Sequence, residues 1–269
     1  MATRLKRRLA QAADEKRGIL FGFLPTGYPD PAEFRTVVGA AFDAGLDALE
    51  ATMPGPAPDL DGPLIQEAAA SAAHHLAGIP DALALAAASR SSDDDTIIAM
   101  AYGHHFDHLS PTDFLGRLAE ADVDAYLVPQ MPMAEQLALG AQAQARGIEP
   151  VIFLHLEEDL RLLATSSLDE PVIYLQSADL RTGGTFNPDK AAERLTELRE
   201  AMGTRRYHVC VGFGVRGFDE AVALMEAGAD GIIIGTRVVQ AAAEGGEAVA
   251  RIVDEVAPAL VRREELRDD

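Results

Sequence analysis

Short apolar runs alternate with longer amphipathic stretches along most of the chain. The runs are about four to six residues long and rich in Ile, Val and Leu, and they lie at residues 19–24, 46–51, 96–101, 123–128, 150–154, 172–176, 208–211 and 231–234. Runs that are apolar at consecutive positions are typical of strands buried on both faces of a parallel sheet. The pattern therefore predicts eight buried parallel strands.

Helix-like segments rich in Ala, Leu and Glu fill the intervals between these runs. Start signals such as Asp30-Pro31 and Asn187-Pro188 and end signals such as Gly45 agree with that interpretation. The predicted helices include residues 31–44, 112–121, 134–146, 188–202 and 218–227, with a short one near 237–242.

Eight strand–helix units in about 250 residues predict an α/β fold, a (β/α)8 TIM barrel that occupies residues 1–269 as one domain. A doubly wound open sheet is the alternative that the pattern alone leaves open. An amphipathic segment at residues 4–15 precedes the first strand, and we expect it to cap the bottom of the barrel. The polar cluster at residues 91–95 is expected to be a surface turn.

Acidic residues outnumber basic ones, 43 against 23, which gives a formal net charge of −20 at pH 7. Such a surface repels nucleic acid and anionic membranes, so we expect neither as a partner. Cys210 is the only cysteine, so no intramolecular disulfide or Cys-based zinc site is expected, and its apolar strand favours a small buried hydrophobe over a nucleophile. We find no secretory signal pattern and no apolar stretch of membrane-spanning length, and therefore expect a cytoplasmic protein.

Two carboxylates stand where a barrel would place its active site, at the carboxyl ends of the strands. Glu50 ends the second apolar run, and burial there would raise its pKa and suit it to proton transfer. Asp61 follows on a Pro- and Gly-rich loop, and two carboxylates in different environments can divide acid and base roles. The alternatives are a structural ion pair for Glu50 and a helix N-cap for Asp61.

Glycine-rich turns follow the seventh and eighth runs. Gly212-Phe213-Gly214 and Gly235-Thr236 resemble the recurrent phosphate site of barrels, in which backbone N–H groups and a helix dipole bind the anion. Thr182-Gly183 could close a third side, and plain turn glycines are the alternative. The arginines at the same strand ends could gather an anionic substrate or could simply pair with the surplus acid; they are Arg181, Arg216 and Arg237.

Three histidines follow the third run: His104, His105 and His108. Histidine is a common metal ligand, but no matching pattern fixes a coordination geometry. We therefore predict no metal and favour a role in a substrate loop or an interface.

At this point the residues resemble a known family, the α subunit of tryptophan synthase. The similarity extends over about residues 15–250 and is carried by the segments 23–30 (FLPTGYPD), 49–50 (LE), 61–66 (DGPLIQ), 100–102 (MAY), 128–132 (VPQMP), 182–183 (TG), 212–214 (GFG) and 235–236 (GT). The resemblance implies a lyase of amino-acid biosynthesis that cleaves indole-3-glycerol phosphate to indole and glyceraldehyde 3-phosphate by a retro-aldol step, with no cofactor.

The resemblance also implies residue roles. Glu50 would protonate indole C3 and manage the proton of the glycerol hydroxyl, while Asp61 would accept the indole N–H. Tyr174 and Thr182 would help to position the substrate and its loop. The backbone around Gly183, Gly212, Phe213, Gly214, Gly235 and Thr236 would hold phosphate. Further residues of the possible substrate loops are Tyr102, His104, Gln130, Arg181, Arg216 and Arg237.

Several loops depart from the family pattern. Residues 51–58 (ATMPGPAP) replace Gly-x-Pro-Phe-Ser-Asp-Pro, residues 102–105 (YGHH) replace Tyr-x-Asn-Pro, and Gln130 replaces an Asp. Residues 154–157 and 178–181 also differ. A tryptophan synthase β-type partner is therefore possible, but the loops that would shape that interface are altered. We interpret the chain as a diverged relative that works without a conventional β subunit.

Two other functions remain open from the sequence. A barrel of the same ancestry could act on another phosphorylated aldol-type substrate, as the altered loops would allow. A non-catalytic binding protein is the third interpretation, but such a protein would be expected to lose the carboxylates first.

Overall fold

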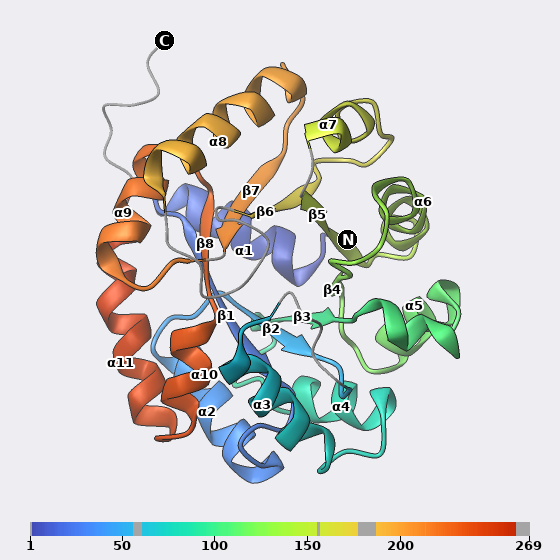
Figure 1. The fold of residues 1–269 in the computed structure, drawn as a ribbon, viewed down its shortest axis with the longest axis vertical. Coiled ribbons are helices and arrows are strands. Elements are labelled where there is room, and N and C mark those ends of the chain that lie inside the picture. The colour runs from blue at the N-terminus through green and yellow to red at the C-terminus, as the bar shows by residue number, and fades with distance from the viewer. Residues whose placement is uncertain (1, 56–60, 155–156, 177–186, 213, 262–269) are drawn as a thin grey trace.

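The strands form one closed parallel barrel in sequence order (Figure 1). The computed structural model describes residues 2–55, 61–154, 157–176, 187–212 and 214–261. The strands are β1 (Ile19–Pro25), β2 (Ala48–Thr52), β3 (Thr96–Met100), β4 (Ala125–Leu127), β5 (Glu149–Leu154), β6 (Val172–Gln176), β7 (His208–Gly212) and β8 (Gly231–Ile234). Parallel pairing of β8 with β1 closes the ring, which confirms the predicted barrel and excludes the open sheet.

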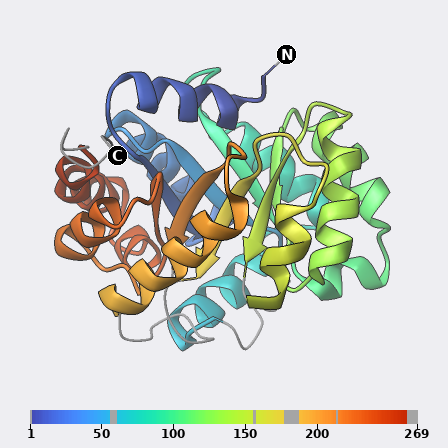
Figure 2. The ribbon, with the colours of Figure 1, turned by 90° about the horizontal axis from the view of Figure 1, so that it is seen from above.

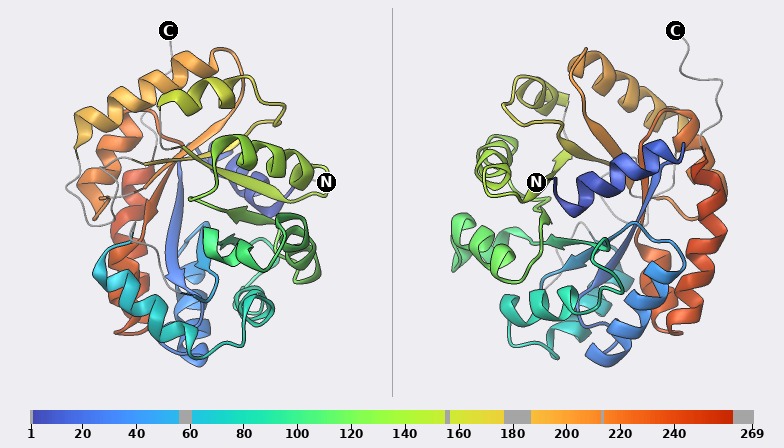
Figure 3. Two further views of the ribbon diagram at one scale, coloured as in Figure 1. Left: turned by 45° about the vertical axis from the view of Figure 1, so that its right-hand side comes forward. Right: turned by 180° about the vertical axis from the view of Figure 1, so that it is seen from behind.

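Helices follow the strands and surround the barrel, as two further views show (Figure 3). They are α1 (Arg4–Asp14), α2 (Pro31–Asp43), α3 (Pro63–Ala73), α4 (Ile79–Ala87), α5 (Pro111–Glu120), α6 (Met133–Gln144), α7 (Glu157–Ala164), α8 (Pro188–Met202), α9 (Phe218–Glu226), α10 (Thr236–Ala242) and α11 (Gly246–Val256), with 3-10 helices η1 (Gly103–Asp107) and η2 (Ala257–Leu260). Within the ranges given above, none of these helices has the length and apolar character needed to cross a membrane.

The local signals that predicted the helix starts operate as expected. Asp30 caps α2 by accepting hydrogen bonds from the N–H groups of Ala32 and Glu33, and Asn187 caps α8 by accepting from Lys190. Every residue of β1 is buried, and Cys210 on β7 is fully buried, as predicted for a small core residue. The core therefore lies within the barrel and between the barrel and its helices.

Helix α1 lies across one end of the barrel (Figure 2), the end at which the strands begin. Asp47, which directly precedes β2 and is 1% exposed, holds it there. The Asp47 carboxylate pairs with Arg8 of α1 and with Arg17, whose Nη1 lies 2.8 Å from Oδ2, and it accepts the Leu20 N–H at 2.9 Å. The expectation that this helix caps the bottom of the barrel is confirmed.

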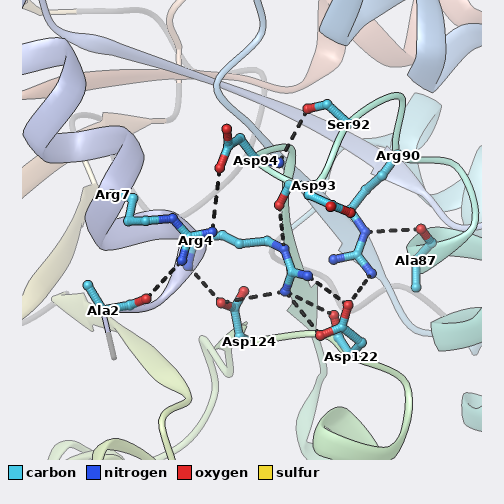
Figure 4. A network of polar contacts seen from close by, with 10 residues as sticks. All are labelled: Ala2, Arg4, Arg7, Ala87, Arg90, Ser92, Asp93, Asp94, Asp122 and Asp124. Carbon is cyan, nitrogen blue, oxygen red and sulfur yellow. Dashed lines mark hydrogen bonds and ion pairs between the residues drawn. The ribbon is translucent and has the colours of Figure 1, made fainter.

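The first turn of α1 is also tied to the loops that lead into β3 and β4 (Figure 4). The Arg4 guanidinium donates to both carboxylate oxygens of Asp122, at 3.2 and 2.7 Å, and the Arg4 N–H donates to Asp124 at 2.7 Å. The predicted turn at residues 91–95 is present, because Asp95 accepts the N–H groups of Ser91 and Ser92. These contacts concentrate the surface ion pairs at the bottom of the barrel.

Candidate active site

Glu50 lies on β2 and is 1% exposed. Its register neighbours are Phe23 on β1 and Ile98 on β3, so its surroundings are largely apolar. Its Oε1 atom has no hydrogen-bond partner among the described residues. Burial, and secondarily the nearby charge of Asp61, raise the pKa of Glu50 to about 8. The alternative of a structural ion pair is not seen among the described residues.

Asp61 directly precedes Gly62, the residue before α3, and is 6% exposed. Its Oδ2 accepts a hydrogen bond of 2.6 Å from the Tyr102 hydroxyl. Burial raises the pKa of Asp61 to about 6, against the opposing effect of that hydrogen bond. The N-cap alternative is wrong, because Gly62 occupies the cap position and the Asp61 carboxylate is directed to Tyr102 instead.

The two carboxylates face one cavity of about 260 Å³. The residues lining it are Phe23, Glu50, Asp61, Ile65, Met100, Tyr174, Gly214, Val215, Arg216, Ile233, Gly235, Thr236, Arg237 and Gln240. The apolar side chains Phe23, Ile65, Met100 and Ile233 were not singled out as site residues. Phe23 could have been predicted, because it pairs in register with Glu50 near the carboxyl ends of β1 and β2. The cavity combines apolar walls with two titratable groups, as small-molecule sites commonly do.

The glycine turns after β7 and β8 reach the same cavity. Gly214 lies at φ +83°, which favours glycine, and Gly235 precedes α10 without a side-chain cap. Because the first N–H groups of a helix have no acceptor within it, those of α10 are available to an anion. Phe213, Arg181, Thr182 and Gly183 lie outside the described residues.

Gly212 has a packing role that sequence reasoning missed. A Cβ atom there would lie 2.7 Å from Cζ of Tyr174 and closer still to its hydroxyl oxygen, so only glycine leaves room for this ring. Tyr174 is 6% exposed on β6, and burial raises its pKa, so its hydroxyl stays protonated near neutral pH. Gly212 therefore determines where Tyr174 lies in the cavity wall.

The two described arginines differ in their pairing. Arg237 lines the cavity, but its guanidinium donates to both carboxylate oxygens of Glu255 at 2.8 Å. For this residue, the alternative that the arginines pair with acidic side chains is therefore confirmed. It also donates to the Arg216 carbonyl. Arg216 is exposed and lines the same cavity, so its charge lies beside the glycine turns.

The remaining predicted loop residues lie around η1, directly after β3. Gln130 accepts the Gly103 N–H at 3.0 Å through Oε1. His104 and His105 have ring centroids 4.0 Å apart and pack against the loop that follows β2. Among the residues that the structure describes, no three His, Cys, Asp or Glu side chains group closely enough to hold a metal ion.

A closed (β/α)8 barrel whose cavity holds two buried carboxylates with raised pKa values, beside glycine turns after β7 and β8, defines a barrel enzyme built for acid–base chemistry. The chain matches the family described as tryptophan synthase alpha chain over residues 9–266. It therefore belongs to that family, whose members are carbon–carbon lyases that cleave indole-3-glycerol phosphate.

Individual relatives agree with this assignment. The chain is 30% identical to the tryptophan synthase alpha chain of Dechloromonas aromatica, covering 88% of each chain. It is 31% identical to that of Synechococcus elongatus, covering 94% of this chain and 96% of the relative. A tryptophan synthase structure from Mycobacterium tuberculosis superposes with a TM-score of 0.82 at 24% identity, covering 98% of this chain and 100% of that one, which shows the shared fold.

Proposed function

We propose that this chain cleaves indole-3-glycerol phosphate to indole and glyceraldehyde 3-phosphate, with Glu50 as the general acid and Asp61 as the ionised partner of the indole N–H. The observation that carries the proposal is the pair of unequal environments. Burial raises the pKa of Glu50 to about 8, whereas the pKa of Asp61 is about 6. Near pH 7 one cavity thus offers a proton donor and a carboxylate acceptor.

Glu50 donates one proton and recovers one in each catalytic cycle. Its carboxyl proton moves to indole C3, and the positive charge that develops on the ring is stabilised by Asp61 at the N–H. The carboxylate of Glu50 then takes the proton of the glycerol hydroxyl. The C–C bond breaks, its electron pair restores the indole ring, and the hydroxyl-bearing carbon becomes the aldehyde. Glu50 ends protonated, ready for another turnover.

The phosphate is proposed to lie at the turns after β7 and β8. Gly214, Gly235 and Thr236 line one part of the cavity wall, and Arg216 adds a positive charge to it. Backbone N–H groups at the start of α10 would donate to the phosphate oxygens. Tyr174, placed by Gly212, would lie against the substrate, while Thr182 and Gly183 keep the roles that the family resemblance implies.

A β-type partner is proposed to be unnecessary for turnover. Members of the family pair with a β subunit, but the loops at residues 51–58 and 102–105 differ here from the family pattern. Parts of both loops contact each other within this chain, through His105 and Pro54. We therefore expect free indole to be released by the chain alone.

The test is indole release from indole-3-glycerol phosphate by the purified chain, with E50Q and D61N as variants. We expect release by the native protein, a loss of at least about a thousandfold in kcat for E50Q, and a smaller loss for D61N. A tryptophan synthase β subunit is then titrated in. Folded native protein that releases no indole with or without it would exclude the proposed reaction, and release only with it would exclude autonomy.

A further inference from the structure

The first residues after β3 contact the loop between β2 and α3 at two places. At one, the Tyr102 hydroxyl donates to Asp61 Oδ2 at 2.6 Å. At the other, His105 Nε2 lies 3.0 Å from the Pro54 carbonyl oxygen. Pro54 is near the start of that loop and Asp61 is at its end. Tyr102, directly before η1, and His105, within η1, therefore contact the loop near both of its ends.

Both ring nitrogens of His105 take part in this arrangement. The Tyr102 N–H donates to His105 Nδ1 at 2.9 Å, so the proton of the neutral ring is on Nε2 and is donated to Pro54. This tautomer satisfies both contacts. A proton on Nδ1 would be directed to the Tyr102 carbonyl oxygen 3.2 Å away, and it would leave the Tyr102 N–H without its acceptor and the Pro54 carbonyl without its donor. Burial lowers the pKa of His105, which favours this neutral form.

The fit between the two loops is close. Gly55 lies at φ +155°, and a Cβ atom on it would collide with His104 Nε2 and lie 3.3 Å from His105 Nε2. The His104 ring packs on His105, with centroids 4.0 Å apart. The segment 53–55 therefore has a defined position against the two imidazoles, and this position depends on a residue without a side chain.

We propose that His105 is a positioning residue for Asp61. By joining the Tyr102 backbone to Pro54, it fixes the start of the loop relative to the Tyr102 hydroxyl and thus fixes the hydrogen bond that orients the Asp61 carboxylate. This inference deepens the proposed function, because it assumes that Asp61 acts on the substrate.

The orientation of Asp61 has a measurable electrostatic consequence. The groups that face Asp61 are Glu50 from β2, Tyr102 from the end of β3 and Tyr174 from β6, while Arg216 and Arg237 line the same cavity. The Tyr102 hydrogen bond favours the ionised form of Asp61 and opposes the effect of burial. Any change that loosens this bond should raise the pKa of Asp61.

The first experiment needs no substrate. Carboxyl 13C NMR titrations, with the Asp61 resonance assigned by its absence in D61N, compare the native chain with Y102F and H105A. We expect the pKa of Asp61 to rise by about one unit in Y102F, and to rise in the same direction by about half a unit in H105A. H75A is the control, since His75 belongs to an exposed His-His pair at the end of α3, and it should leave the value unchanged.

Two conservative variants separate the contacts of His105 and keep the test decisive where H105A does not fold. Asn places an acceptor where Nδ1 lies but loses the reach to Pro54, whereas Gln places a donor near Nε2. We expect H105N to shift Asp61 like H105A, and H105Q to return its pKa to within about 0.2 unit of the native value. An Asp61 pKa equal to the native one in every folded His105 variant, while Y102F shifts it, overturns the proposal.

Kinetics provide the second measurement. H105A should lower kcat/KM about tenfold with most of the loss in kcat, and the acid limb of its pH profile should move to higher pH with the Asp61 pKa. H105Q should recover most of the rate. A pure loss of folded protein would lower the apparent kcat at constant KM but would not move the acid limb, so the position of the limb separates the two explanations. If no variant and no native protein releases indole, the proposed function fails, but the NMR titration still decides the role of His105.

Discussion

Burial acts differently on Glu50 and Asp61, although both side chains are less than a tenth exposed. Glu50 has an oxygen without a described partner, so burial dominates its protonation, whereas Asp61 accepts from Tyr102 and remains the stronger acid. The assignment of acid and acceptor thus depends on one tyrosine hydroxyl. The groups around each carboxylate decide which one holds a proton, since two carboxylates in the same environment would be interchangeable.

The raised pKa of Glu50 makes the stability of the protein depend on pH. Between its unfolded value of about 4.5 and its folded value of about 8, the folded chain holds a proton that the unfolded chain has released. The free energy of unfolding therefore falls as pH rises through this window. Gln cannot ionise, so the stability of E50Q relative to the native chain should rise by about 4 kcal/mol between pH 5 and pH 9.

Urea denaturation of both proteins across pH 5–9 measures this difference. E67Q, which changes an exposed glutamate on α3, is the matched control and should give a difference that is flat with pH. A pH-independent difference for E50Q as well would mean that Glu50 is ionised in the folded chain at neutral pH, and would remove it as the proton donor.

At the scale of elements, the two ends of the barrel have different tasks. The carboxyl ends of the strands surround the cavity, and the amino ends are closed by α1 and its ion pairs. Asp47 is central to closing this end, because its carboxylate, directly before β2, binds Arg8 of α1, Arg17 and the Leu20 N–H at the start of β1. Damage at this end should therefore affect stability rather than turnover.

D47N tests this separation. Asn keeps the shape and one acceptor but removes the charge that Arg8 and Arg17 share, and breaking a buried ion pair from one side costs about 3–5 kcal/mol. Thermal and urea unfolding should show that loss, while kcat of the folded fraction stays within about twofold of the native value. D94N, which breaks the exposed 3.5 Å pair with Arg7, should cost under about 0.5 kcal/mol. An equal loss in both variants would contradict the role of Asp47.

The strands were predictable because consecutive apolar residues allow few other structures. The eight runs favoured the barrel, but only the pairing of β8 with β1 excludes an open sheet; given the barrel, the carboxyl-end rule located Glu50, Asp61 and the glycine turns. Boundaries moved by a residue or two: the second run was predicted from residue 46, but β2 begins at Ala48 because Asp47 binds arginines instead. The existence of these elements follows from local pattern.

Other features could not be predicted, since they depend on contacts between distant segments. The helix η1 has no apolar periodicity, and its His105 contact with Pro54 spans 51 residues. Asp61 was assigned a possible cap role because it stands just before a predicted helix, and its actual partner, Tyr102, lies 41 residues away. The need for Gly212 beneath Tyr174 likewise appears only when β6 and β7 are paired. The chemistry of the site depends on these contacts between distant residues, and the spacing of residues along the sequence does not predict them.

For the whole molecule, the net charge of −20 opposes both compaction and the approach of an anionic substrate. Arg216 beside the glycine turns supplies local positive charge at the cavity, and Arg237 does so only in part, because Glu255 pairs with it. The rest of the surface contributes repulsion. Salt should therefore change both stability and substrate capture.

Raising KCl from 0.02 to 0.2 M should increase the free energy of unfolding by about 1 kcal/mol, because the Debye length falls from about 20 Å to about 7 Å and screens the self-repulsion. Urea titrations at fixed pH measure this, with sucrose at matched osmolality as the control for excluded-solute effects. A stability that stays constant with salt would mean that the acidic residues are compensated locally, chiefly by pairs such as Arg4 with Asp122.

Asp47 directly precedes β2 and Glu50 lies three residues later, within the strand, and their free-energy effects have opposite signs. One carboxylate strengthens the fold and the other weakens it for the sake of chemistry. Selection for thermal tolerance should therefore retain Asp47 and its arginines, and should find its easiest gain, the loss of the Glu50 charge, closed to any lineage that must still turn over substrate. Substitutions should therefore be restrained for different reasons at the two ends of the barrel axis, by stability at the closed end and by turnover at the open one.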